Sequence, residues 1–205
     1  TPYAESSLVV AGLSPDFGQL HFLVRGARRL GRKHFPVADL FRVLRVQFHP
    51  KPQGLLTWRS ADIVADFAAI ARRPRAYDTA MWLAHFTLAN ALENDPATRF
   101  YGALKVSLNR LAQAAMQGSP APELLSACLI GSCLSFLDEH GLLPDYKGDA
   151  SHHQHRELLL QMGSGAREVP QLQSADWPRL MKWTLALLRY SECRIPEELP
   201  ELIRD

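Results

Sequence analysis

Short apolar runs separated by turn residues dominate the first 60 residues of the chain. The segments SLVVAGL (7–13) and QLHFLVRG (19–26) flank the turn SPDFG, which is typical of a β-hairpin with a short connection containing glycine. Apolar residues lie among arginines in LFRVLRVQFH (40–49), and the turn HPKPQG leads to GLLTWRS (54–60), a fourth strand candidate. Four strands with short connections predict a small antiparallel barrel or sandwich. Closing a five-stranded barrel would require one more strand ahead of Thr1.

From about Asp62 the apolar spacing changes to the period of a helix. A short helix is predicted over residues 62–73 and a longer one over 76–94, which ends before the natural cap Asp95–Pro96. In the next helix, apolar residues recur at spacings of three and four and form one stripe. The members of this stripe are Phe100, Leu104, Leu108, Leu111 and Ala115.

Two more helices are predicted in the C-terminal part of the chain. One starts at Ser119–Pro120 and is stopped by Gly141, and the last covers residues 177–190. Residues at about 145–175 have little apolar pattern and are predicted to form a polar loop. The fold class is therefore α+β, with strands in a domain over residues 1–61 and an all-helical domain over residues 62–205.

Charge is distributed unevenly between these two parts. Residues 1–75 contain 12 Lys and Arg against 5 Asp and Glu, whereas residues 76–205 contain 11 against 16. The net formal charge of +2 conceals this asymmetry. A basic N-terminal part joined to an acidic C-terminal part predicts that any contact with nucleic acid lies in the N-terminal part.

A cluster of basic side chains follows the second strand candidate, in FLVRGARRLGRKHF (22–35). Gly26 and Gly31 allow the backbone to turn and to approach a ligand closely. Arginines can bind phosphate groups through paired hydrogen bonds, so the cluster predicts a contact with the phosphates of a nucleic acid. Its members are Arg25, Arg28, Arg29, Arg32 and Lys33.

Arg42 and Arg45 are further candidates for contact with a nucleic acid, on the next predicted strand. They are three residues apart, so we expect them to point to opposite faces and not to form one patch. Aromatic residues nearby could stack on bases, as in small barrels that bind single-stranded nucleic acid. The alternative is that these aromatics fill the barrel core and the arginines are solvated. The aromatics are Phe22, Phe35, Phe41, Phe48 and Trp58.

Cysteine usage and hydropathy predict a cytoplasmic protein. Cys128, Cys133 and Cys193 form no CxxC pair, and we expect buried reduced thiols and not a disulfide or redox pair. No apolar run approaches the roughly 18 to 20 residues of a membrane span. The opening TPYAES lacks the pattern of a signal peptide, and we expect no membrane partner.

Catalytic signatures are lacking. The sequence contains no GxSxG elbow, Walker loop, HExxH motif or close carboxylate pair. Asp138, Glu139 and His140 form a compact acid and base set, but at a helix end they are expected to cap the helix or to face water. His85 is expected to be a core or boundary residue. We therefore predict that the protein is not an enzyme and has no cofactor.

The histidines of SHHQH invite a metal interpretation. His152, His153 and His155 are close in sequence, but zinc requires about four ligands and a third and fourth on one face are not evident. We predict a polar loop without a metal site. A metal-dependent hydrolase that uses these histidines remains an alternative.

The number of large apolar side chains in the helical part is compatible with a second interpretation, a protein-interaction adaptor. Most of them must be core, but some could line a groove for an amphipathic or acidic peptide, beside Arg99, Lys105 or Arg110. An adaptor of this kind that touches no nucleic acid is the second interpretation. The groups are Met81, Trp82, Phe86, Trp177, Met181 and Trp183.

Three stretches carry a resemblance to a known family. The first, with a PYGE-like opening and a GARR ending, is PYAESSLVVAGLSPDFGQLHFLVRGARR. The second passes from a strand into helices and is GLLTWRSADIVADFAAIARRPRAYDTAMWLAHFTLANALEND. The third ends in a GxxPdL-like turn and is LLSACLIGSCLSFLDEHGLLPDY. In this order and spacing they resemble RecO, the bacterial recombination mediator family. The resemblance covers most of residues 2–146.

The resemblance implies an oligonucleotide-binding (OB-fold-like) barrel followed by a helical domain. It also implies a nucleoid-associated cytoplasmic protein of recombinational repair, which binds single-stranded and double-stranded DNA and anneals complementary strands. It implies cooperation with RecR in loading RecA onto DNA coated by the single-stranded DNA-binding protein, whose acidic C-terminal tail would dock on the helical domain.

The chain departs from the family pattern at two places. Many RecO members carry two CxxC pairs after the PdL position, but here the first pair is replaced by Asp149–Ala150–Ser151–His152 and no cysteine appears before Cys193. This predicts a RecO variety without zinc. The sequence also starts at the PYGE-like residues, so the first barrel strand is missing or lies upstream. DNA length and strand preference, oligomeric state and the helical residues that meet partners are not encoded in any of these patterns.

Overall fold

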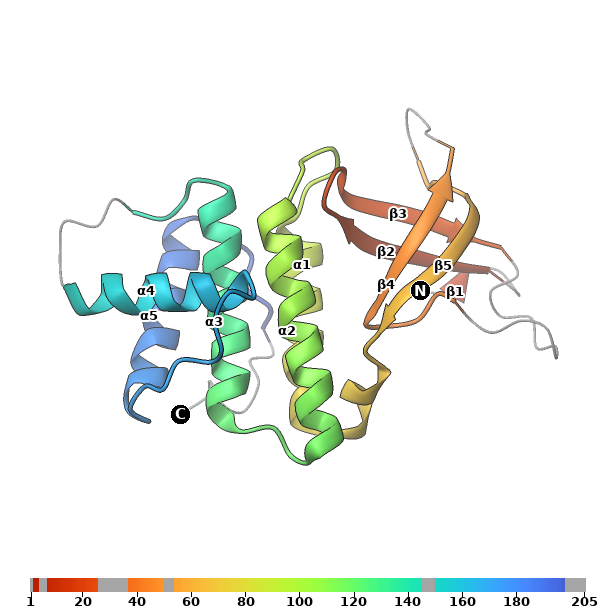
Figure 1. Cartoon of the computed structure of the whole chain (residues 1–205). Helices are drawn as coiled ribbons and strands as arrows, with labels where there is room; N and C mark the ends of the chain where they lie inside the picture. Colours follow the sequence, from red (N-terminus) through yellow and green to blue (C-terminus); the bar gives the residue numbers. More distant parts are fainter. Residues whose placement is uncertain (1, 4–6, 26–36, 50–53, 145–149, 198–205) are drawn as a thin grey trace.

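The computed structural model describes residues 2–3, 7–25, 37–49, 54–144 and 150–197. The strands lie at one end of the molecule and most of the helices at the other, with α1 and α2 next to the strands (Figure 1). No helix within the described residues is long and apolar enough to cross a bilayer.

Within the described part of the chain, five strands form two small antiparallel sheets. β1 (Pro2–Tyr3), β2 (Ser7–Ser14) and β3 (Gly18–Val24) make one sheet in that order, and β4 (Arg42–Phe48) pairs with β5 (Trp58–Asp66) in the other. The predicted hairpin between the first two long strands is confirmed, since β2 and β3 pair antiparallel along their full length.

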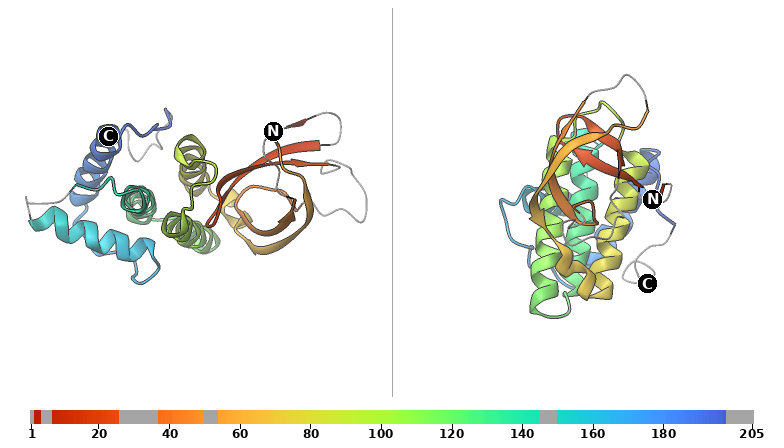
Figure 2. Two further views of the ribbon diagram at one scale, coloured as in Figure 1. Left: turned by 90° about the horizontal axis from the view of Figure 1, so that it is seen from above. Right: turned by 90° about the vertical axis from the view of Figure 1, so that its right-hand side faces the viewer.

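A parallel contact joins the two sheets. Phe22 of β3 bridges Leu56, just before β5, through hydrogen bonds from Leu23 N to Leu56 O (2.7 Å) and from Leu56 N to His21 O (2.8 Å). The strands therefore follow the order β1-β2-β3-β5-β4 and curl into a barrel-like wall, seen end-on in Figure 2. This arrangement confirms the predicted OB-fold-like domain. Among the described residues no ladder joins β1 to β4, so these strands leave the barrel open.

Alternate residues of the strands fill the small barrel core. Phe22, Val24 and Leu56 are buried, and the rings of Phe48 and Trp58 pack against Phe22 at centroid distances of 5.4 and 6.0 Å. The alternative interpretation of these aromatics is therefore correct for Phe22, Phe48 and Trp58.

The predicted helix over residues 62–73 is wrong. β5 continues to Asp66, and only Ala68–Arg72 is helical, as the 3₁₀-helix η1. Apolar spacing was compatible with a helix, but the antiparallel ladder with β4 satisfies the backbone of residues 58–66 instead. The predicted domain division between residues 61 and 62 falls inside this strand.

Five α-helices follow among the described residues. Their bounds are α1 Pro74–Asn90, α2 Thr98–Gln117, α3 Pro122–Glu139, α4 Ala150–Gly163 and α5 Asp176–Tyr190. The predicted helices at 76–94, at the Phe100 stripe, before Gly141 and at 177–190 are confirmed as α1, α2, α3 and α5. Gly141 has a φ of +65°, the left-handed conformation that ends helices.

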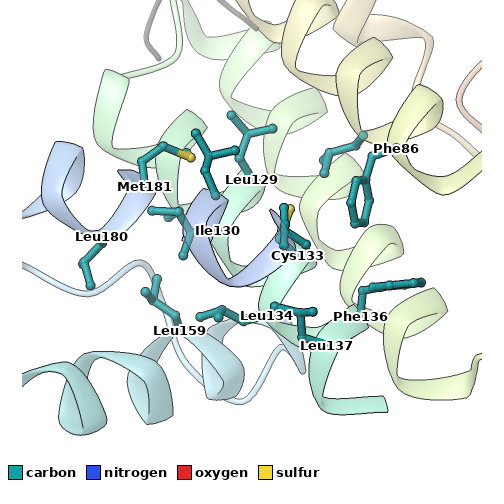
Figure 3. Close-up of a cluster of buried hydrophobic side chains, with 14 of the residues drawn as sticks. Phe86, Leu129, Ile130, Cys133, Leu134, Phe136, Leu137, Leu159, Leu180 and Met181 are labelled. Atoms are coloured by element: carbon teal, nitrogen blue, oxygen red, sulfur yellow. The ribbon is translucent and has the colours of Figure 1, made fainter. Parts of the chain in front are cut away.

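Helix α3 is the centre of the helical domain. Residues 125–137 are all buried, because neighbouring helices cover every side of α3. Side chains from α1, α4 and α5 converge on it, among them Phe86, Leu159 and Met181 (Figure 3). The thiols of Cys128 and Cys133 are buried and free, and Cys193 is half-buried and free, as predicted. Burial raises the pKa of Cys128 to about 12.

Helix α4 lies inside the stretch that was predicted to be a polar loop, so that prediction is wrong for Ala150–Gly163. The N-terminal half of α4 is polar, so the sequence shows no clear helical spacing of apolar residues there. Leu159 and Met162 are nevertheless fully buried against α3. Two glycines permit the close approach: a Cβ on Gly131 would lie 2.6 Å from Met162 Cε, and a Cβ on Gly163 would lie 2.9 Å from Ser135 Oγ.

Backbone hydrogen bonds hold the strand domain against the helical domain. The β2–β3 turn (residues 15–19) lies against the α1–α2 loop (residues 91–97), and we call this contact the interdomain clamp. Gly18 sits at its centre with a φ of +66°, and a Cβ there would lie 2.2 Å from Leu92 O. The clamp bonds run from Gln19 N to Leu92 O (2.9 Å), from Asn94 N to Phe17 O (2.9 Å) and from Ala97 N to Pro15 O (3.0 Å).

Candidate nucleic-acid interface

The predicted basic cluster begins where β3 ends. Arg25 directly follows β3 and is exposed, and among the described residues it has no carboxylate partner within 4.0 Å. The other four members, Arg28, Arg29, Arg32 and Lys33, lie outside the described residues. Their contact with DNA stays a prediction.

Arg59 is a basic residue that the sequence analysis missed. It is exposed, and it is the extra residue of a β-bulge, because Phe48 pairs with Trp58 and Gln47 with Ser60. Bulges bend a strand and redirect the side chain at the bulge.

The parallel contact between the sheets relates Arg59 to Arg25. Phe22 bridges Leu56, and three residues further along each chain stand Arg25 and Arg59. The residues before them, Val24 and Trp58, both pack into the barrel core, whereas Arg25 and Arg59 are exposed. We therefore expect the two guanidinium groups to lie along the same seam of the barrel.

Arg45 and Arg42 differ in their surroundings. Arg45 is exposed on β4 opposite Asp62 of β5, and no ion pair within 4.0 Å joins them. The side chain of Arg42 is only 5% exposed and its Nε lies 3.0 Å from Asp66 Oδ2. Arg42 also lies 3.9 Å from a carboxylate oxygen of Asp39 and donates a hydrogen bond to Val37 O at 3.2 Å. Its guanidinium is thus occupied by groups of the protein itself, whereas that of Arg45 faces solvent.

Two comparisons with known proteins bear on this barrel. The family model described as "Recombination protein O N terminal" matches residues 1–67, a segment that ends one residue after β5. The DNA repair protein RecO of Geobacter metallireducens is 28% identical over 120 residues, which cover 58% of this chain and 47% of the relative. Residues 1–67 are therefore similar to the N-terminal domain of the RecO family. The chain matches about half the length of the curated relative.

The acid and base set Asp138, Glu139 and His140, at the end of α3, has a structural role, and it joins α3 to neighbouring segments instead of capping α3 itself. Glu139 Oε2 accepts a hydrogen bond from Phe100 N at 2.7 Å, in the first turn of α2, where backbone N–H groups have no partner in the helix. Asp138 forms an ion pair with Arg99, and His140 Nε2 lies 3.4 Å from Asp95. The set joins the end of α3 to the start of α2 and to the loop between α1 and α2.

The helical domain contains the basic residues expected beside a peptide groove and the histidines of the metal interpretation. Arg99 is neutralised by Asp138, and Arg110 donates to Met162 O (3.1 Å) near the end of α4, so both serve helix ends. Lys105 is exposed, and no ion pair is recorded for it with any described residue. The side chains of His152 and His153 lie outside the description, and the described residues contain no cluster of three potential metal ligands.

Proposed function

We propose that this chain is a non-enzymatic DNA-binding mediator of recombinational repair. The observation that carries the proposal is the match of residues 1–67 to the RecO N-terminal family. The matched relative is a DNA repair protein by name. The chain would bind single-stranded and double-stranded DNA through its barrel and anneal complementary strands.

The charge distribution supports a grip on DNA phosphates by the barrel. Arg25, Arg45 and Arg59 are exposed and have no carboxylate within 4.0 Å among the described residues. Four more basic residues follow Arg25 within nine positions of sequence. Arginine forks match the geometry of phosphate oxygens, and such contacts carry no base preference. We therefore propose binding largely without regard to sequence.

The partners of the mediator follow from the family resemblance. RecR would act with this chain to load RecA onto DNA coated by the single-stranded DNA-binding protein, and the acidic tail of that coating protein would dock on the helical domain. Lys105 is an exposed cation of that domain and would suit an acidic peptide.

The direct test of the barrel site is the salt dependence of DNA affinity. Replacing Arg28 and Arg29 by alanine removes two predicted phosphate contacts, so the slope of log affinity against log salt for a single strand should become shallower by about 1.4. The matched control is Arg179→Ala/Lys182→Ala on α5, which removes the same charge from the far side of the helical domain. Equal affinities and slopes for the wild type and the Arg28/Arg29 variant would refute the site, and a wild type without DNA affinity would refute the proposed function.

The adaptor interpretation predicts a different result in the same assay. The internal pairing of Arg42 with Asp39 and Asp66 is the observation that favours it. An adaptor would bind the tail peptide of the coating protein but no oligonucleotide, and the barrel variant would leave peptide binding unchanged.

A further inference from the structure

A second group of exposed arginines lies outside the barrel, where the strand domain passes into the helices. Arg72 ends η1, Arg73 precedes α1 and Arg75 lies in the first turn of α1, and all three are exposed. We call them the junction arginines. In Figure 1 this part of the chain, in yellow, lies below β4 and β5.

The junction arginines have no acidic counterpart. No carboxylate of the described residues lies within 4.0 Å of any of them, and the first turn of α1 contains no acid. Asp78, one turn later on α1, is the nearest acid in sequence and forms no recorded ion pair. The N-terminal end of a helix carries a partial positive charge, so Arg75 in the first turn of α1 is repelled by that end, and the three neighbouring arginines repel one another. A polyanion would relieve this repulsion.

The two acids that lie between the barrel and this junction are already satisfied by other groups. Asp66 binds Arg42 and also accepts a hydrogen bond from Ala68 N at 2.8 Å. Asp39 lies 3.9 Å from Arg42 and accepts from Leu40 N at 2.8 Å. Because these carboxylates are engaged, the positive charge of the junction stays available to a ligand.

Arg73 is also held in place. Its Nε donates to Ala115 O at 3.3 Å, at the C-terminal end of α2, and no partner among the described residues is recorded for its two terminal nitrogens. A guanidinium that is fixed through one nitrogen loses less side-chain entropy when the others bind phosphate.

The junction is connected to the end of the basic barrel segment. Residues 37–41 lead from that segment into β4, and Phe41 O accepts a hydrogen bond from Phe67 N (3.0 Å) at the start of the junction. The ring of Phe41 packs edge-on against Tyr77 of α1, at a centroid distance of 5.8 Å. The chain after the barrel cluster is therefore fastened to the element that carries the arginines.

We propose that the junction arginines are a second phosphate-binding surface, which extends the DNA path from the barrel onto the start of the helical domain. This inference rests on the proposed function, since it assigns a further part of the same nucleic-acid contact. The partner is a sugar-phosphate backbone, and the surface would contribute most on strands long enough to pass beyond the barrel.

The test replaces Arg72 and Arg75 by glutamine and retains Arg73, whose Nε holds α2. For a long single strand the salt slope should become shallower by about 1.4, because each phosphate contact contributes about 0.7. The control Arg179→Gln/Lys182→Gln removes the same charge from α5 and should leave the slope unchanged. Arg72→Lys/Arg75→Lys keeps the charge and should retain the wild-type slope, which separates a lost contact from a disturbed fold.

Each outcome distinguishes this inference from the proposed function. If the wild type binds DNA and the Arg28/Arg29 variant loses slope, but the junction variant behaves like the α5 control, only the junction surface is refuted. If the junction variant keeps DNA binding but loses affinity for a polyglutamate peptide, the surface serves an acidic protein and the inference is also overturned. If the wild type does not bind DNA, both fail.

Discussion

The strand domain and the helical domain differ most in how much core each one buries. Among the described residues, the barrel core contains three buried side chains, whereas the main cluster of the helical domain contains nineteen. Apolar burial is the main favourable term in folding, so the helices are expected to supply most of the stability and the barrel little of its own. We therefore expect the stability of the barrel to depend on its attachment to the helices, and its surface carries charged residues.

The largest expected effect is a truncation in the helical core. Phe86 is fully buried on α1 and its ring packs against those of Phe100 and Phe136, at centroid distances of 6.3 and 5.3 Å. Phe86→Ala should lower the free energy of unfolding by about 3–5 kcal/mol in urea denaturation. Because the clamp loop follows α1, we expect the strands to lose structure in the same transition.

The control for this truncation lies on the same helix. Leu88 is exposed, so Leu88→Ala should change the free energy of unfolding by less than about 0.5 kcal/mol. Retention of a separate barrel transition in Phe86→Ala, reported by the fluorescence of Trp58, would contradict the dependence of the barrel on the helices.

The second effect concerns the interdomain clamp. Gly18→Ala should lower the free energy of unfolding by about 2–4 kcal/mol, because the left-handed backbone disfavours alanine and its Cβ would collide with Leu92 O and Asp95 O. Gly54 also has a positive φ, but no atom of the described residues lies within 4 Å of its Cβ position, so Gly54→Ala isolates the conformational cost of about 1–2 kcal/mol. Equal losses in the two variants, measured by urea denaturation, would show that the clamp contact contributes nothing.

The elements that the sequence predicted well are those that local patterns determine. The β2–β3 hairpin and α5 combine clear periodicity with turn or capping residues, and both have nearly the predicted bounds. The end of β5 and helix α4 depend instead on distant partners. Residues 62–66 extend because β4 lies beside them, and α4 is fixed by the glycine contact with α3.

The residues of the candidate site also differ in whether a local pattern or a distant contact determines their place. Arg25 was predicted from the run of basic residues after a strand, a local signal. Arg59 was missed because its relation to Arg25 depends on the parallel contact of Phe22 with Leu56, which no local pattern encodes. The pairing of Arg42 with Asp66 was hidden for the same reason, since 24 positions separate these residues.

A smaller effect separates structural from ligand-binding arginines in the barrel. Arg42→Gln should lower the free energy of unfolding by about 1–2 kcal/mol. The substitution removes a nearly buried guanidinium, so the partly exposed carboxylate of Asp66 loses its ion pair. Its DNA salt slope should equal that of the wild type. Arg25→Gln should do the opposite, with less than about 0.5 kcal/mol of destabilisation and a slope shallower by about 0.7.

Urea denaturation and DNA titration of both variants provide this check. If Arg42→Gln also reduced the slope, Arg42 would contact phosphate in addition to its ion pair, and the division between the two residues would be incorrect.

The smallest expected effect tests whether charge contributes to the clamp. His21 Nε2 lies 4.0 Å from Glu93 Oε1, and the Glu93 side chain is 67% exposed, so the pair is weakened by water and salt. Glu93→Gln should change the free energy of unfolding by less than about 0.5 kcal/mol at neutral pH, in contrast to Gly18→Ala. A loss approaching that of Gly18→Ala would mean that side-chain charge holds the two domains together. A negligible loss would leave the backbone hydrogen bonds of residues 15–19 and 91–97 as the attachment through which the helices support the barrel.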